Sequence, residues 1–263
     1  MATLVQHSDA LRGALIREAG EWALAFQRFL SYLCFPVFSA LLIGALRFRA
    51  GYRVRDLRAV RRRFREIVRE HDGPLLVCPN HLTMLDSVIL MWACMSPWNY
   101  MWDYSKLAWN IPARENFAHD PVRRLITYLG KCLPIDRRGS REHIEDVMGK
   151  LTYLLREGEV VIVFPEGTRS RTGRIELDEM TYGVGRIVQD VPGLKALCVY
   201  LRGDKQESYS DLPAKNDVFS IDMKLYTPPA DPARGMRGQR EIALGIGREL
   251  KAMEEAYFAR REA

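Results

Sequence analysis

The chain lacks the cysteine patterns that mark a disulfide-stapled or zinc-binding protein. Its five cysteines are odd in number and widely spaced along 263 residues. None belongs to a Cys-x-x-Cys pair, and none stands at zinc-ligand spacing from a histidine. We therefore expect small buried side chains in a reducing compartment, and no metal site.

The sequence also lacks internal repeats, low-complexity tracts and a cleavable signal. Its first apolar stretch begins too far from the N-terminus, and no small-residue cleavage pattern follows it. Hydrophobic residues make up 48% of the chain, which is enough to build a core. These features argue against a repeat array or a disordered protein and favour one large domain or two small ones.

Acidic residues are almost missing from one part of the chain. Between Arg47 and Arg65, nine arginines face a single acid, Asp56. The whole chain has a formal charge of only +6, so this block accounts for the imbalance. Such a block suits an anionic surface, and the apolar segment beside it favours acidic lipid over nucleic acid. We predict contact with an acidic membrane and no nucleic-acid partner.

What the sequence does contain is an uncharged apolar run from Phe29 to Leu46. As a helix it would span about 27 Å, close to the ~30 Å hydrocarbon core of a bilayer. The arginines that follow predict that the later residues lie on the cytoplasmic face of the inner (plasma) membrane. Pro36 predicts a kink or break, so the alternatives are a bent hairpin in one leaflet and a buried core helix. Residues 9–30 have the one-sided apolar pattern of an interfacial helix, which supports the hairpin.

Downstream, apolar segments with strand and helix spacing alternate. A basic amphipathic helix is predicted at 52–71 and a long final helix at 239–259. Between them we predict strands at 75–78, 98–104, 132–135, 160–164, 197–201 and 219–226, and helices at 87–95, 120–129 and 140–156. This order predicts an α/β protein with a mixed, mostly parallel central sheet flanked by helices. We divide the chain into N-terminal membrane-associated helices (1–50), the basic helix (51–71) and a single main domain (72–263).

The segment after the strand predicted at 75–78 reads Asn80-His81-Leu82-Thr83-Met84-Leu85-Asp86. A neutral imidazole can take a proton from an alcohol when a carboxylate holds its other ring nitrogen. In one continuous helix His81 and Asp86 would lie about 140° apart and would not face each other. The pair therefore requires a turn, which Pro79 and a helix N-cap at Thr83 can supply. The competing interpretation is a capping box in which Asp86 only accepts from a backbone amide, with Asn80 as a turn former.

A second polar loop, Pro165-Glu166-Gly167-Thr168-Arg169-Ser170, follows the strand predicted at 160–164. Gly167 allows the backbone to approach a ligand closely or to take a positive φ. Thr168 and Ser170 offer hydroxyl groups, and Arg169 offers a bidentate fork for phosphate. Glu166 is expected to pair with Arg169 or to order the loop. The alternative is a tight turn with solvated arginines.

Together, Asn80-His81 with Asp86 and the segment from Phe164 to Ser170 resemble the glycerolipid acyltransferase family, whose best-known members are the lysophosphatidate acyltransferases. The resemblance covers residues 72–230 and extends to the segment from Gly130 to Arg137. It implies a 1-acylglycerol-3-phosphate O-acyltransferase-like enzyme in phospholipid biosynthesis. Such an enzyme moves a fatty acyl chain from acyl-CoA or acyl-carrier protein to the hydroxyl of a lysophospholipid, and it needs no metal or bound cofactor.

The resemblance also implies roles for individual residues. His81 is the general base and Asp86 orients it, with Asn80, Thr83 and Ser170 in support. The acceptor and its phosphate are implied to lie against Glu166, Gly167, Thr168, Arg169 and Arg137. Independently of the family, we expect backbone amides after Thr83 to stabilise the tetrahedral oxyanion.

Two segments depart from the family pattern. The stretch from Lys106 to Phe117 lacks the usual glycine, and residues 196–203 lack the usual Val-Pro pair. Both regions border the acceptor or acyl site in the family, so a lysolipid with another head group, such as a lyso-amino-acid lipid, is an alternative acceptor. A non-catalytic lipid-binding protein on the same fold and a thioesterase are the further alternatives.

Overall fold

The computed structural model describes residues 2–71, 73–116, 120–229 and 233–262. A five-stranded sheet with the order β1-β5-β4-β2-β3 lies at its centre. Its strands are β1 (Arg53–Val54), β2 (Leu75–Pro79), β3 (Val161–Ile162), β4 (Lys195–Gly203) and β5 (Val218–Tyr226). Of its neighbouring pairs β4 and β5 run antiparallel, and the others are parallel. The prediction of an α/β fold with a mixed, mostly parallel sheet is confirmed.

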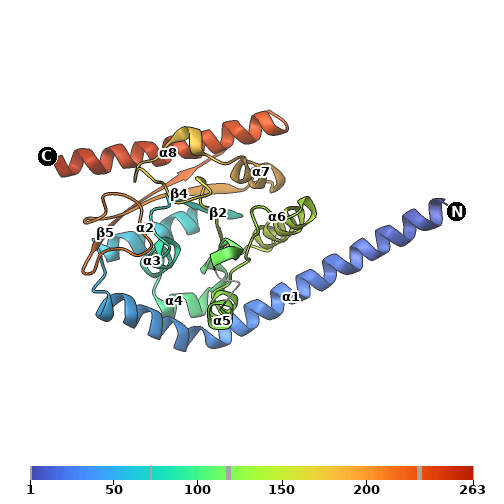
Figure 1. The fold of residues 1–263 in the computed structure, drawn as a ribbon, viewed down its shortest axis with the longest axis horizontal. Coiled ribbons are helices and arrows are strands. Elements are labelled where there is room, and N and C mark those ends of the chain that lie inside the picture. Colours follow the sequence, from blue (N-terminus) through green and yellow to red (C-terminus); the bar gives the residue numbers. More distant parts are fainter. Residues whose placement is uncertain (1, 72, 117–119, 230–232, 263) are drawn as a thin grey trace.

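Helices cover both faces of this sheet. One face carries α6 (Arg141–Arg156), α7 (Tyr182–Asp190) and α8 (Met236–Glu262). The other carries α2 (Leu57–Glu70), α3 (Asp86–Cys94) and α4 (Pro97–Trp102). Figure 1 shows α7 and α8 above the sheet and α3 and α4 below it. Because β2 lies between β4 and β3 with both faces covered, all its residues are buried, which explains its uninterrupted apolar sequence.

The N-terminal region is one long helix, α1 (Ala2–Gly44), continued by a π-helical turn at Ala45–Arg49. The helix runs through Pro36 without a break, so the hairpin given as an alternative is not formed. In Figure 1 its ribbon changes direction where it passes beneath α4 and α5 (Pro121–Leu129). Proline removes one backbone donor, and α1 packs against α4 and α5 along this part of its length.

Most of the apolar part of this helix is exposed or only partly buried. The segment Glu18–Arg49 is long and apolar enough to cross a bilayer, and only 22% of its apolar window is buried. The alternative of a buried core helix is therefore wrong. The interfacial pattern predicted for residues 9–30 is described here only from Glu18 onward, because the side chains of residues 2–17 lie outside the described part. Within that part, Trp22 and Phe26 are exposed whereas Leu24 is buried.

Several predicted elements have another type or other bounds. The strand predicted at 98–104 is helical, because the Ser96 hydroxyl accepts from the Asn99 amide at 3.2 Å and Pro97 begins the helix. Residues 132–135 form isolated bridges rather than a strand of the sheet. The helix predicted from residue 52 begins at Leu57, after β1, and the strand predicted at 160–164 is limited to β3.

Candidate active site

The loop after β2 brings His81 and Asp86 together. Pro79 ends β2, and Asp86 is the first residue of α3, so the chain turns between them as the sequence predicts. His81 Nδ1 lies 3.1 Å from Asp86 Oδ2. Asp86 is buried, whereas the His81 side chain keeps 17% of its surface exposed. The carboxylate thus holds Nδ1, and among the described residues no hydrogen bond occupies Nε2.

Asp86 is held by more than the histidine. Its Oδ2 accepts from the backbone amides of Leu82 at 2.6 Å and Thr83 at 2.7 Å, and its Oδ1 accepts from the Thr83 hydroxyl at 2.5 Å. The helix begins at Asp86 and not at Thr83, so the predicted N-cap at Thr83 is wrong. The bond from the Thr83 amide, which the capping-box interpretation expected, and the contact with the histidine nevertheless form on the same carboxylate. The two interpretations of Asp86 are therefore compatible, and the backbone bonds set the position of the carboxylate.

The second loop supports the first through its backbone. The His81 amide donates to Glu166 Oε1 at 2.9 Å, and the Ser170 amide donates to the His81 carbonyl at 2.9 Å. The imidazole stacks on Phe164, with ring centroids 3.9 Å apart. The two loops that the sequence singles out, about eighty residues apart, thus form one unit around His81.

Glu166 lies beneath this unit rather than at its surface. Only 5% of the residue is exposed, and this burial raises the pKa of its carboxyl to about 8. The carboxylates of Glu254, Asp86 and Glu176 raise that pKa further, whereas the hydrogen bond from the His81 amide lowers it. Of the two roles expected for Glu166, it orders the loop and does not pair with Arg169. Arg169 instead donates to Asp211 Oδ1 at 2.5 Å and to the Ser210 carbonyl at 3.0 Å.

Gly167 takes a conformation that disfavours other residues. Its φ is +68°, and a Cβ at this position would lie 2.6 Å from Cγ2 of Thr181. The glycine is required for the turn itself, which leaves Thr168 exposed at the tip. Ser170 uses its hydroxyl to donate to the Arg174 carbonyl at 2.5 Å, so it closes the loop on its far side.

Two further predicted residues lie apart from this unit. Asn80 joins β2 to β4, because its amide group donates to the Leu201 carbonyl at 3.1 Å and accepts from the Leu201 amide at 2.7 Å. Arg137 lies exposed in the turn between α5 and α6. In the described part of the chain it makes no hydrogen bond or ion pair, and its implied contact with the acceptor phosphate stays a prediction.

The connection from β4 to β5 is a part of the site that the sequence did not reveal. The Met84 amide donates to the Asp211 carbonyl at 3.1 Å, and the Ser210 amide donates to the Leu82 carbonyl at 3.0 Å. Arg202 holds this connection from below: its guanidinium donates to the carbonyls of Gly173, Gln206 and Glu207 at 2.6, 2.8 and 3.0 Å. The signal in the sequence for this connection was the absence of the family's Val-Pro pair from residues 196–203, the segment that contains Arg202.

An apolar cavity of about 310 Å³ adjoins the histidine loop. Met84 and Leu85 line its edge nearest His81, and Ser87 and Asn110, which hydrogen bond to each other at 2.8 Å, are among its few polar groups. The remaining wall comes from α1, α3, α4, α5 and the segment between α4 and α5, and includes Phe35, Leu42, Met91, Tyr100, Ala108 and Ile126. No spacing in the sequence identifies these residues as neighbours.

The fold and this site define an α/β domain in which a His–Asp pair lies beside an apolar cavity. A family model described as Acyltransferase matches residues 53–230, which is more than half of the chain. The chain therefore belongs to this family of glycerolipid acyltransferases, and the resemblance found in the sequence is confirmed. The match includes both loops around His81 and the lysine-containing segment before Arg137. A search of curated proteins returned no match.

Proposed function

We propose that the protein is a membrane-associated O-acyltransferase that transfers a fatty acyl chain from acyl-CoA or acyl-carrier protein to the free hydroxyl of a lysolipid resembling lysophosphatidate. The observation that carries the proposal is the 3.1 Å contact between His81 Nδ1 and Asp86 Oδ2 beside the apolar cavity. A base of this kind must stand where an acyl chain and a hydroxyl can meet.

The proposed reaction begins when His81 Nε2 takes the proton of the acceptor hydroxyl. The acceptor oxygen attacks the thioester carbonyl carbon and forms a tetrahedral oxyanion. The carbon–sulfur bond then breaks, and His81 returns the proton to the thiolate. Asp86 stabilises the imidazolium in between. The Met84 and Leu85 amides are poor candidates for the oxyanion, because they already donate to the Asp211 carbonyl and the Thr83 hydroxyl.

The apolar cavity is proposed to hold the acyl chain. Its lining is almost entirely hydrophobic, and it includes Met84 and Leu85 from the His81 loop, which supports the proposal that the reactive end of a bound chain lies near His81. Ala108 lines the wall and is buried. Replacing it with valine and then phenylalanine should progressively shorten the preferred acyl chain, because each side chain removes volume. Turnover with acyl-CoA of graded chain length measures this preference, and the Tm of each variant shows whether it is folded. An unchanged chain-length preference in a folded Ala108→Phe enzyme would show that the cavity does not hold the acyl chain.

The acceptor is proposed to meet the exposed loop at Thr168 and Arg169, with Glu166 and Gly167 shaping it and Arg137 approaching on binding. Arg169 keeps 27% of its side chain exposed and is paired with Asp211, which is 77% exposed. A phosphate would compete with Asp211 for the guanidinium. This carboxylate at the rim also favours the second candidate, a lysolipid whose head group carries an amine.

The proposed domain organisation places the protein on the cytoplasmic face of the inner membrane. Residues 1–50 would anchor it, residues 51–71 would contact acidic lipid, and residues 72–263 would form the acyltransferase domain. Exposed apolar side chains support this arrangement, because they gather on three neighbouring helices: Phe29, Leu33, Val37 and Leu41 on α1, Trp98 and Trp102 on α4, and Val122 and Leu125 on α5.

The test is a transfer assay with purified protein in detergent, acyl-CoA and a panel of lysolipids that includes lysophosphatidate and a lyso-amino-acid lipid. His81→Ala should reduce turnover by at least about 10²-fold, as the loss of a general base does. His71→Ala is the matched control, since His71 lies outside the site and bonds to the Pro74 carbonyl. Thiol release without a lipid product would indicate a thioesterase. Turnover retained by His81→Ala would contradict the mechanism. If neither acyl-CoA nor acyl-carrier protein supports turnover, a non-catalytic lipid-binding protein is favoured.

A further inference from the structure

The outer edge of the sheet is open along most of β5. β1 pairs only with Val218 and Phe219 before the chain turns away into α2. Arg53 and Arg55 donate their amides to the carbonyls of Asp217 and Phe219, so these odd-numbered residues direct their backbone groups to the outer edge. The direction of the backbone amide and carbonyl groups alternates along a strand. These groups therefore also face the outer edge at Ile221, Met223 and Leu225. No described strand pairs with them there.

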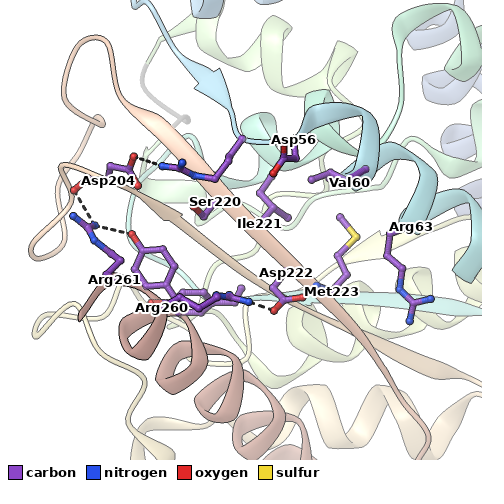
Figure 2. A pocket seen from close by; sticks show the side chains of 14 residues that line it. Asp56, Val60, Arg63, Asp204, Ser220, Ile221, Asp222, Met223, Arg260 and Arg261 are labelled. Atoms are coloured by element: carbon purple, nitrogen blue, oxygen red, sulfur yellow. Dashed lines mark hydrogen bonds and ion pairs between the residues drawn. The ribbon is translucent and has the colours of Figure 1, made fainter. Parts of the chain in front are cut away.

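This edge forms the floor of a groove with two helical walls. The groove has a volume of about 710 Å³ and is lined by residues 220–223 of β5, by Val60 and Arg63 of α2, and by Tyr257 and Arg260 of α8. In Figure 2, α2 lies on one side of the strand with Met223 and Arg63, and α8 lies on the other with Arg260. The edge is therefore recessed, and a single extended chain fits it better than the helix-flanked sheet of a second copy.

The arginines in the groove differ in how closely they are paired with acceptor groups. Arg55 donates to Asp204 at 2.7 Å, and Arg261 donates to the Asp204 carbonyl and the Tyr257 hydroxyl. Among the described residues, Arg63 and Arg260 have only distant partners, Glu66 at 3.9 Å and Asp222 at 3.7 Å, and their side chains are 50% and 63% exposed. Weakly paired positive charge is thus present on both walls, with Arg63 on the α2 side of the strand and Arg260 on the α8 side.

We propose that the β5 edge is a docking site for an extended acidic segment of a partner protein, which adds a strand to the sheet. Successive side chains of a strand point to opposite faces. Two adjacent acidic residues would therefore reach Arg63 on one wall and Arg260 on the other, while backbone groups pair with Ile221 and Leu225. Asp222 Oδ1 holds the Met223 amide at 2.9 Å, which partly protects the free edge from unselective pairing.

The proposal is independent of the proposed acyl transfer, and it changes the interpretation of the arginine block. Arg55 and Arg63 line the groove. They belong to the stretch from Arg47 to Arg65 that the sequence assigns to acidic lipid, so this stretch is divided between two surfaces. The groove also lies at the end of α8 that carries the C-terminus, on the side of the molecule where α2 and β5 meet.

The test uses the full chain in detergent and a fluorescein-labelled synthetic peptide of alternating valine and threonine with a central aspartate–glutamate pair. Fluorescence anisotropy should show binding that is weakened about two- to fivefold by Arg63→Ala and by Arg260→Ala. Arg62→Ala is the matched control, because Arg62 also lies on α2 and is 69% exposed but does not line the groove. Hydrogen exchange should show slower exchange of the Ile221 and Leu225 amides when the peptide is bound.

Three results would overturn the proposal. The first is equal binding of a peptide whose acids are replaced by amides, or of one whose pairing amides are methylated, since charge and strand pairing would then be unnecessary. The second is unchanged exchange at Ile221 and Leu225. The third is protection of these amides by anionic vesicles alone or by self-association detected in light scattering, which would assign the edge to lipid or to a second copy.

Discussion

At the scale of residues, a buried carboxylate organises each half of the site. Asp86 accepts three hydrogen bonds from its own loop in addition to the contact with His81. Its position therefore does not depend on the histidine, and the imidazole is oriented by a group that the backbone has already placed. Glu166 does the same for the His81 backbone, but its environment favours the protonated form.

The protonation of Glu166 gives a prediction about pH. Burial raises the pKa of Glu166 to about 8 from 4.5, so between these values the unfolded chain releases its proton more readily than the folded protein. This carboxyl therefore lowers the free energy of unfolding as pH rises from about 4.5 to about 8. Glu166→Gln keeps an acceptor for the His81 amide and removes the titration. Its Tm relative to wild type should rise between pH 5 and pH 8.

Differential scanning calorimetry at these two pH values measures the effect. Glu179→Gln is a suitable control, because Glu179 lies exposed on the nearby turn Leu177–Glu179 and does not contribute to the pKa shift of Glu166. A constant difference in Tm between Glu166→Gln and wild type at both pH values would show that Glu166 is ionised throughout.

At the scale of elements, the question is how α1 is held against the domain. Gln27 donates to the carbonyls of Tyr128 and Cys132, both at 3.0 Å, and Ser31 donates to the Leu129 carbonyl at 2.5 Å. Arg28 Nε lies 2.8 Å from Glu159 Oε1. These bonds join α1 to the end of α5, to Cys132 after it and to Glu159, and both α1 and the end of α5 line the apolar cavity. The anchoring of α1 and the shape of the cavity therefore depend on the same contacts.

Glu159 is the centre of this anchoring and gives a second prediction. Its Oε2 accepts from Lys131 Nζ at 2.6 Å and from the Trp109 indole at 2.8 Å. Lys131 is fully buried, and this burial lowers the pKa of its ammonium group to about 8 even with Glu159 present. Glu159→Gln leaves the lysine without its carboxylate, which should reduce the free energy of unfolding at pH 7 by about 3–5 kcal/mol.

Denaturant unfolding checks this value, with the exposed neighbour Glu157→Gln as control. The difference from wild type should shrink at pH 9, above the folded pKa of Lys131, because the lysine is then largely neutral in both proteins. Equal stability of Glu159→Gln and Glu157→Gln at pH 7 would mean that the ion pair does not hold this region together.

At the scale of the whole molecule, the apolar surface lies on one side. α1, α4 and α5 carry most of the exposed large hydrophobic side chains, whereas α8 covers the opposite face of the sheet. If this side rests in a bilayer, Trp98 and Trp102, which are 68% and 76% exposed, lie at the depth where indole rings gather. The cavity then lies between the membrane and the His81 loop, which suits a lipid substrate.

Quenching by brominated lipid tests this orientation. In vesicles containing such lipid, the quenched fraction of tryptophan fluorescence should fall in a Trp98→Phe/Trp102→Phe protein. Trp109→Phe is the control, because Trp109 is fully buried beside Glu159. An equal fall in both proteins, or no fall in the double variant, would place α4 away from the bilayer.

Much of the fold and site could be predicted because the signals are local. Alternating apolar segments indicated the sheet and its helices, and Gly167 indicated a backbone with positive φ. Pro79 and a helix start expected after Thr83 indicated a turn that brings His81 to its carboxylate, although the helix begins only at Asp86. The aromatic content of residues 98–104 suggested a strand, but the Ser96 cap and Pro97 outweighed it. Each of these outcomes depends on residues within one or two turns of each other.

The sequence by itself thus determined the family, the order of elements and the His–Asp loop. Only the tertiary structure decided that Glu166 lies buried under His81, that Arg169 pairs with Asp211, that Lys131 meets Glu159, and that the edge of β5 is open. The physical reason is that these features join segments far apart in the chain. Their distances depend on strand order, and the charge of a buried carboxyl depends on how much water the packing around it excludes.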